Sequence, residues 1–144
     1  YAAMGLDGFF LDNTDIYYQY PKEDIYRGLK AILTGLKQYS LPLILNGGDT
    51  FVQKIIEDGS ALSLFDGVNQ ECVFTKIDFS KPSYLSQDKE TKAYYEEYLE
   101  KAKTAGLSVY LTEYQADSSL SKEIDRYCKE KGFLWYNAES LELR

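Results

Sequence analysis

The stretch Gly8-Phe9-Phe10-Leu11-Asp12-Asn13 is a short apolar run that ends in a carboxylate and an amide. Four further runs of this kind lie along the chain, at residues 43–46, 68–71, 109–113 and 133–137. Helix-like stretches separate the runs, and strands that alternate with helices are typical of a parallel sheet covered by helices. Chemistry in such folds lies at the C-terminal ends of the strands. Each polar residue that closes a run is therefore a candidate site residue.

Apolar residues at helical spacing predict four helices between these strands. They cover residues 23–39, a short segment around 51–56, residues 88–105, and a last segment that begins after 117–119 and ends at Gly132. The stretches 14–22 and 74–87 are predicted to be long loops that follow strand ends. Loops in that position usually carry binding function.

Five strands and four helices predict an α/β fold built from parallel β/α units. An eight-stranded barrel typically needs ~250 residues, whereas this chain has 144. The chain is therefore expected to form one domain, residues 1–144, that is either an open sheet or the second part of a barrel whose first strands are missing. Residues 1–5 look like the last turn of a helix with its closing glycine, so we expect the chain to begin in the middle of a domain.

Composition and charge narrow the class of partner. The hydrophobic content of 44% is sufficient for a real core, and the net charge is −7. No run of Lys or Arg is dense enough to follow phosphates, so nucleic acid and anionic membranes are poor partners. No segment approaches the ~18 consecutive apolar residues that a membrane-spanning helix needs.

The residue types that are absent exclude several kinds of catalysis. The chain contains no His, which excludes Ser-His-Asp and Cys-His catalysis and every His-ligated metal site. Its two cysteines, Cys72 and Cys128, lie far apart and form no metal-binding or redox pair. Both are expected to be buried free thiols, and the residues indicate no metal and no cofactor.

Three carboxylates close predicted strands and are candidates for catalysis. If Asp12, Glu71 and Glu113 all project inward at the strand ends, they meet in one cleft. Neighbouring acids separate one another's pKa values, so that one can stay protonated while another is ionised. A pair of this kind is the apparatus of glycoside hydrolysis. A strand-end acid can instead cap the following helix, which is the role expected of Asp49 and Asp117.

Polar and aromatic side chains accompany these acids. Sugar rings pack their apolar faces on aromatic planes, while amides and Tyr hydroxyls bond the ring hydroxyls. The residues predicted to bind substrate follow or neighbour the acids at the strand ends, and about half of the aromatics are instead expected in the core. The candidates are Asn13, Asp15, Tyr17, Asn46, Gln70, Glu113, Tyr114, Trp135 and Tyr136.

The segment Gly5-Leu6-Asp7-Gly8-Phe9-Phe10-Leu11-Asp12-Asn13-Thr14-Asp15 resembles a signature of glycoside hydrolase family 114, the endo-α-1,4-polygalactosaminidase-like proteins. Four later segments resemble the same family in the expected order, at residues 45–48, 69–74, 112–114 and 132–136. The likeness covers essentially the whole chain.

The resemblance implies that the chain supplies about strands four to eight of a (β/α)8 TIM barrel. It also implies a secreted or cell-surface glycosidase that cuts galactosamine-containing polysaccharides. The presumed catalytic pair maps to Asp12 and Glu71, which we expect to act as nucleophile and general acid/base, respectively. A half barrel exposes a wide apolar face, so we further expect self-association or pairing with a missing N-terminal part of the barrel.

Two other interpretations remain open from the sequence. One is a carbohydrate-binding pseudo-enzyme that keeps the cleft without turnover. The other is an unrelated α/β enzyme in which Asp12, Asp15 and Glu71 hold Mg²⁺.

Overall fold

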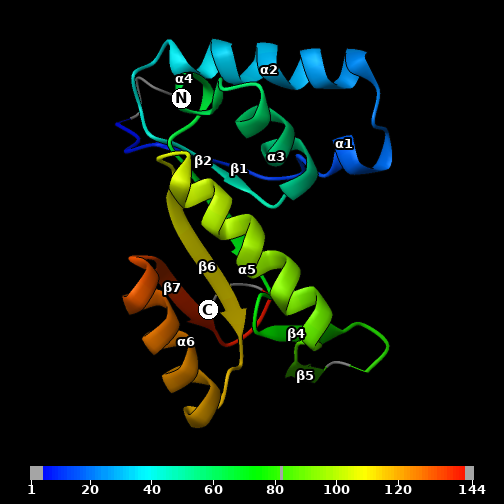
Figure 1. The fold of residues 1–144 in the computed structure, drawn as a ribbon, viewed down its shortest axis with the longest axis vertical. Helices are drawn as coiled ribbons and strands as arrows, with labels where there is room; N and C mark the ends of the chain where they lie inside the picture. Colours follow the sequence, from blue (N-terminus) through cyan, green and yellow to red (C-terminus); the bar gives the residue numbers. More distant parts are fainter. Residues whose placement is uncertain (1–4, 82, 142–144) are drawn as a thin grey trace. The chain divides into compact units, whose positions relative to one another are not determined.

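The computed structural model describes residues 5–81 and 83–141, whose helices and strands are labelled in Figure 1. The helical turn expected at residues 1–4 lies outside these ranges. The chain divides into two compact units. The first comprises Tyr1–Asn69 and Glu100–Ser108, and the second comprises Gln70–Leu99 and Val109–Arg144.

Three parallel strands form the sheet of the first unit: β1 (Phe9–Leu11), β2 (Leu43–Asn46) and β3 (Gly67–Glu71), the last of which continues into the second unit. Phe10 pairs with Ile44, and Asn46 pairs with Asn69. Along the whole sheet the strand order is β1-β2-β3-β6-β7. The fold is therefore mixed α/β with a mostly parallel sheet, as the alternating pattern predicts.

Four helices pack on one another in the first unit: α1 (Ile16–Gln19), α2 (Glu23–Lys37), α3 (Asp49–Glu57) and α4 (Ala61–Leu64). Their apolar stripes and one face of the strands form a core that is closed to solvent. It includes Leu43, Leu45, Phe51, Val52 and Ile55. Because side chains alternate along a strand, Leu43 and Leu45 share the buried face of β2.

The second unit contains a hairpin, the helix α6 and two parallel strands. The hairpin is β4 (Thr75–Asp78) paired with β5 (Ser83–Ser86). Strand β6 (Ser108–Tyr114) begins at the boundary of the first unit, α6 (Ser118–Lys131) follows it, and α6 packs on β7 (Leu134–Ala138). Helix α5 (Lys89–Thr104) begins in this unit and ends in the first. Thr112 pairs with Tyr136, and Glu113 pairs with Asn137.

The predicted strands and the four longer helices are confirmed, whereas three local predictions were wrong. The segment 14–22 is not a continuous loop, since it contains α1. The segment 74–87 is not an open loop, since it contains the β4–β5 hairpin. Asp49 is not a helix cap, because Gly48 occupies that position with a left-handed backbone. Asp117 does cap α6 and accepts hydrogen bonds from the backbone N–H groups of Ser119 and Leu120. None of the helices in the described residues is long and apolar enough to cross a membrane.

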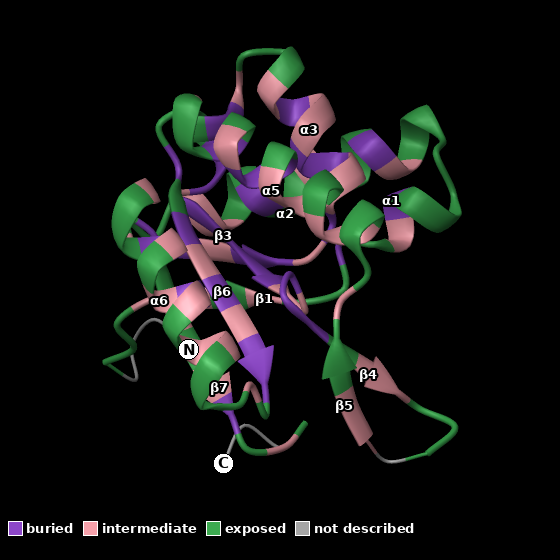
Figure 2. Cartoon of the chain, turned by 60° about the horizontal axis from the view of Figure 1, so that its bottom comes forward, coloured by how far each residue is buried: buried purple, intermediate pink, exposed green. Residues whose placement is uncertain are grey.

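One strand face in each unit carries exposed apolar side chains. On β6 buried and partly exposed residues alternate, as the bands along this strand in Figure 2 show. In the first unit Phe10 is 59% exposed, and in the second Leu134 is 65% exposed. Phe10 pairs with Ile44 on β2, and Leu134 pairs with Tyr110 on β6. Ile44 and Tyr110 both lie on the partly exposed face of their strands. These faces are the ones that a closed barrel would turn inward.

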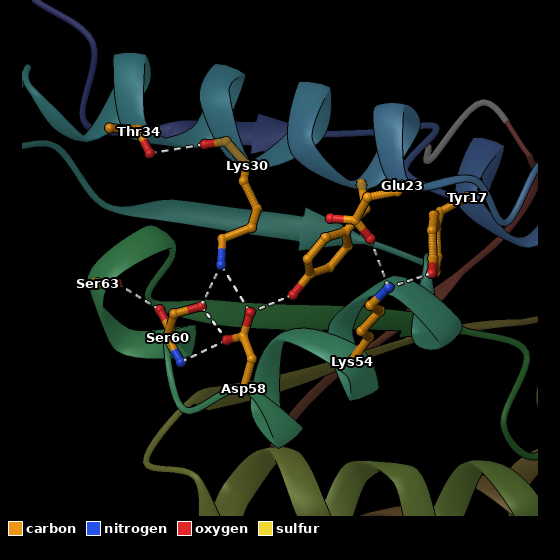
Figure 3. A network of polar contacts seen from close by, with 9 residues as sticks. Tyr17, Glu23, Lys30, Thr34, Lys54, Asp58, Ser60 and Ser63 are labelled. Atoms are coloured by element: carbon orange, nitrogen blue, oxygen red, sulfur yellow. Dashed lines mark hydrogen bonds and ion pairs between the residues drawn. The ribbon is translucent and has the colours of Figure 1, made fainter.

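A polar network fastens the end of α3 to α2 in the first unit (Figure 3). Asp58 accepts hydrogen bonds from Lys30 Nζ at 2.8 Å and from the hydroxyls of Tyr26 and Ser60. Burial favours the neutral carboxyl, but the hydrogen bonds outweigh it and hold the pKa of Asp58 well below its ordinary value. Four residues before Asp58, Lys54 Nζ donates to the Tyr17 hydroxyl at 3.0 Å.

Replacing Asp58 by Asn is expected to destabilise the protein by about 1 kcal/mol near neutral pH, because Asn cannot supply the charge that Lys30 meets. A lowered folded-state pKa adds stability above the ordinary value of 3.8 that is lost as the pH falls through the folded pKa. The difference in the free energy of unfolding between the unmodified protein and Asp58→Asn should therefore shrink below pH 3.8. Urea unfolding at a series of pH values measures it.

Asp24→Asn is the matched control. Asp24 pairs with Arg27, but both side chains are exposed, so the free energy of unfolding should hardly change. An Asp58→Asn effect that is equally small, or that grows at low pH, would contradict the stabilising role of the network.

Candidate functional site

A ladder of polar side chains crosses the C-terminal ends of the three strands in the first unit. Asn69 Nδ2 donates to Asn46 Oδ1 at 2.7 Å, and Asn46 Nδ2 donates to Asp12 Oδ1 at 3.2 Å. Both Asn side chains are buried, whereas Asp12 is exposed. Two buried amides therefore hold the exposed carboxylate that the sequence indicates as a nucleophile.

Asn69 was not among the predicted site residues. It lies two positions before Glu71 on the same strand, so the strand alternation places both on one face. Asn46 was predicted as a sugar-binding residue, but its Oδ1 and one of its N–H groups are used within the ladder.

The backbone turns sharply after each of four strands. Asn13, Gly47, Cys72 and Gln115 all have positive φ values, of 67°, 65°, 59° and 48°. They directly follow Asp12, Asn46, Glu71 and Tyr114, respectively. Three of the four are not glycine, and such residues cost about 1–3 kcal/mol in this conformation. Stored strain of this kind clusters at functional sites, which supports a functional role for this end of the strands.

Asp15 and Tyr17 have structural partners. Asp15 Oδ1 accepts a hydrogen bond from the backbone N–H of Gly48 at 3.0 Å. A Cβ on Gly48 would lie 2.0 Å from Thr14 Oγ1, so only glycine fits there. Tyr17 is buried, and its ring packs edge-on against Phe51. The expectation that Tyr17 contacts a sugar therefore gains no support, because core packing uses its ring. Asp15 orders the turn after β2, and Asn13 at the end of β1 is exposed.

Glu71 lies in the second unit at the end of β3. Its Oε2 accepts a hydrogen bond from the Tyr114 hydroxyl at 2.8 Å. Burial of Tyr114 and its bond to Glu71 raise the pKa of the Tyr114 phenol well above its ordinary range. The hydroxyl therefore stays protonated and remains a donor to Glu71.

Glu113 points away from the face that carries Tyr114 and is 0% exposed. Its carboxylate accepts hydrogen bonds from the backbone N–H groups of Val73, Phe74 and Thr75 at 3.0, 3.0 and 2.8 Å. Burial raises the pKa of Glu113, although these hydrogen bonds oppose the shift. The expectation that Glu113 meets a sugar gains no support, because the carboxylate is enclosed and organises residues 73–75.

The other predicted binding residues, Gln70, Trp135 and Tyr136, do not all lie on the open face of their strands. Gln70 is buried, and its Nε2 donates to the Glu71 carbonyl at 3.0 Å. Trp135 pairs with Leu111 and Tyr136 with Thr112, so the two aromatics lie on opposite faces of β7. Tyr136 is 49% exposed and lies on the face open to solvent.

Residues 5–81 and 83–141 contain no group of three or more His, Cys, Asp or Glu side chains arranged to hold a metal ion. The magnesium hypothesis therefore gains no support from them. Both cysteines are free thiols, as predicted, but only Cys128 is buried, whereas Cys72 is partly exposed.

Searches for relatives found a match only among solved structures. No protein-family model matches the chain, and no curated protein does. The glycoside hydrolase domain of PelA from Pseudomonas aeruginosa superposes with a TM-score of 0.75 at 17% identity, over 99% of this chain and 58% of that domain. A glutamate-to-alanine variant of that domain gives a TM-score of 0.75 at 16% identity, with the same coverage. The fold of this chain is therefore similar to that of part of this glycoside hydrolase domain. At this identity the likeness shows the fold, and the chain spans little more than half of its neighbour's length.

Cys72 and Cys128 are expected to react slowly with iodoacetamide near pH 8. Burial, with the nearby charge of Glu113, raises the pKa of both thiols to about 12. The thiolate is the nucleophile, and a free thiol has a pKa of about 8.5, so alkylation should be at least ~100-fold slower than that of free cysteine. Mass spectrometry of timed samples measures each rate.

The unfolded chain in concentrated guanidinium chloride is the control, and both thiols should react there at the rate of free cysteine. Rapid labelling of Cys72 in the native protein would show that the turn after Glu71 opens to solvent.

Proposed function

We propose that the chain is part of a glycoside hydrolase that cuts an amino-sugar polysaccharide, with Asp12 as nucleophile and Glu71 as general acid/base. The observation that carries the proposal is that each carboxylate ends a strand and is held by a hydrogen bond inside its own unit, from Asn46 or from Tyr114. The fold likeness to a glycoside hydrolase domain and the resemblance of the motif series to family 114 support it.

The two carboxylates divide the chemistry between them. Glu71 protonates the glycosidic oxygen as the bond to the anomeric carbon breaks, and Asp12 attacks that carbon. Glu71 then removes a proton from the water that releases the sugar. Carboxyl groups ~5–5.5 Å apart fit this retaining mechanism, whereas ~6.5–9.5 Å would make Asp12 a base in an inverting one.

The substrate class follows from charge and from the resemblance. A net charge of −7 suits a polymer of partly deacetylated, cationic amino sugars, and family 114 proteins are galactosaminidase-like. The exposed ring of Tyr136 on the open face of β7 offers a surface on which a sugar can pack. By the same resemblance, we place the protein outside the cell or at its surface.

Glu71→Gln is expected to lower hydrolysis of a galactosamine polymer by at least about 10²-fold, since the amide cannot transfer the proton. Asp12→Asn should cause a loss of similar size, because the amide is not a nucleophile. Product release by the full-length protein, followed by mass spectrometry, measures both effects, and circular dichroism checks the fold.

Glu130→Gln is the matched control, since Glu130 is exposed on α6 and far along the chain from both acids. Full turnover by Glu71→Gln would remove Glu71 from the mechanism. If the unmodified protein binds the polymer but releases no reducing ends, the chain is a carbohydrate-binding module.

We also propose that the open strand faces are covered in solution, by a second copy or by the rest of a barrel. The mass of this chain measured by light scattering should rise with concentration, because association buries Phe10 and Leu134. Phe10→Ser with Leu134→Ser should shift the protein toward the monomer. An unmodified chain that stays monomeric at high concentration would contradict self-association.

A further inference from the structure

Glu71 is the end of a row of three side chains within the second unit. The Tyr114 hydroxyl donates to Glu71 Oε2 at 2.8 Å. The Tyr84 ring, from β5, lies against the Tyr114 ring with centroids 5.9 Å apart and 14° between the ring planes. Nearly parallel rings at this distance attract one another and restrict each other's rotation. The stack thus fixes the ring whose hydroxyl bonds the carboxylate.

We propose that Tyr114 is a positioning residue that holds the Glu71 carboxylate in place for proton transfer, and that Tyr84 keeps Tyr114 in that position. The inference rests on the proposed function, in which Glu71 is the acid/base. It gives Tyr114 a role other than sugar contact. A phenol has one hydrogen to donate, and Tyr114 donates it to Glu71.

The hairpin that carries Tyr84 is tied at both ends to the chain that follows Glu71. At its start, the backbone N–H of Thr75 donates to the buried carboxylate of Glu113 at 2.8 Å. After its end, Gln87 donates from its backbone N–H to the Phe74 carbonyl at 2.8 Å and from Nε2 to the Cys72 carbonyl at 2.9 Å. Tyr84 is therefore presented by a fixed element.

Thr75 also ties the hairpin to Tyr114 itself. Its Oγ1 accepts a hydrogen bond from the Tyr114 backbone N–H at 3.1 Å. The main chain of Tyr114 and the first residue of β4 are thus held together, while the two rings stack farther along. The row Tyr84–Tyr114–Glu71 rests on buried backbone contacts.

Nuclear magnetic resonance of the full chain, with ¹³C in the Glu side-chain carboxyls, tests the row without any need for activity. The Glu71 signal is the one that Glu71→Gln removes. Tyr114→Phe should move this signal because the hydrogen bond is lost while the ring stays. Tyr84→Leu should also move it, whereas Tyr84→Phe keeps the ring and should keep the signal of the unmodified protein.

Tyr94→Phe is the matched control, because it removes a hydroxyl from an exposed tyrosine of α5 and should leave the Glu71 signal unchanged. A Glu71 signal that does not move in Tyr114→Phe overturns the positioning role, whether or not the chain hydrolyses any polymer.

Kinetics on a galactosamine polymer then separate positioning from sugar binding. Tyr114→Phe should lower kcat by about 10–100-fold and leave KM within about twofold, since a misplaced catalytic group slows the chemical step. A raised KM with unchanged kcat would make Tyr114 a sugar contact and overturn the inference. If Glu71→Gln hydrolyses normally, the proposed function fails, and the resonance test still decides whether the row exists.

Discussion

In-register parallel pairing is the constraint on which the site of the first unit depends. Asn46 lies directly opposite Asn69 in the ladder of β2 and β3. Because the two amides lie at the same level, Asn69 can donate a side-chain hydrogen bond to Asn46. Asn46 in turn donates a hydrogen bond to Asp12. A shift of one residue in either strand would turn one amide to the other face. The register therefore determines whether the carboxylate is held.

A buried charge plays the corresponding part in the second unit. The Glu113 carboxylate is enclosed and meets the backbone N–H groups of residues 73–75. An ionised group without partners would be very costly in such a place, so these hydrogen bonds are needed for the fold. They also fix the start of the hairpin that carries Tyr84. A residue that looks catalytic by its position in the sequence thus acts by ordering a loop.

Left-handed backbone at Asn13, Cys72 and Gln115 follows the ends of β1, β3 and β6. Exposed apolar side chains lie on a strand of each unit, Phe10 on β1 and Leu134 on β7. The chain spans 58% of the glycoside hydrolase domain that it resembles in fold. The open faces are consistent with a part of a larger barrel, because a complete barrel fills its interior with such side chains.

The sequence by itself determined the order of strands and helices, since apolar periodicity depends on local spacing. It also indicated Asp12 and Glu71 as residues at strand ends. Only the tertiary structure decided which neighbour each carboxylate meets. Because side chains alternate along a strand, Glu113 and Tyr114 point to opposite sides of β6. The sequence does not say which of these two residues points toward the helices. Asn69 and Tyr84 were missed because their roles come from partners distant in the chain, through pairing register and ring stacking.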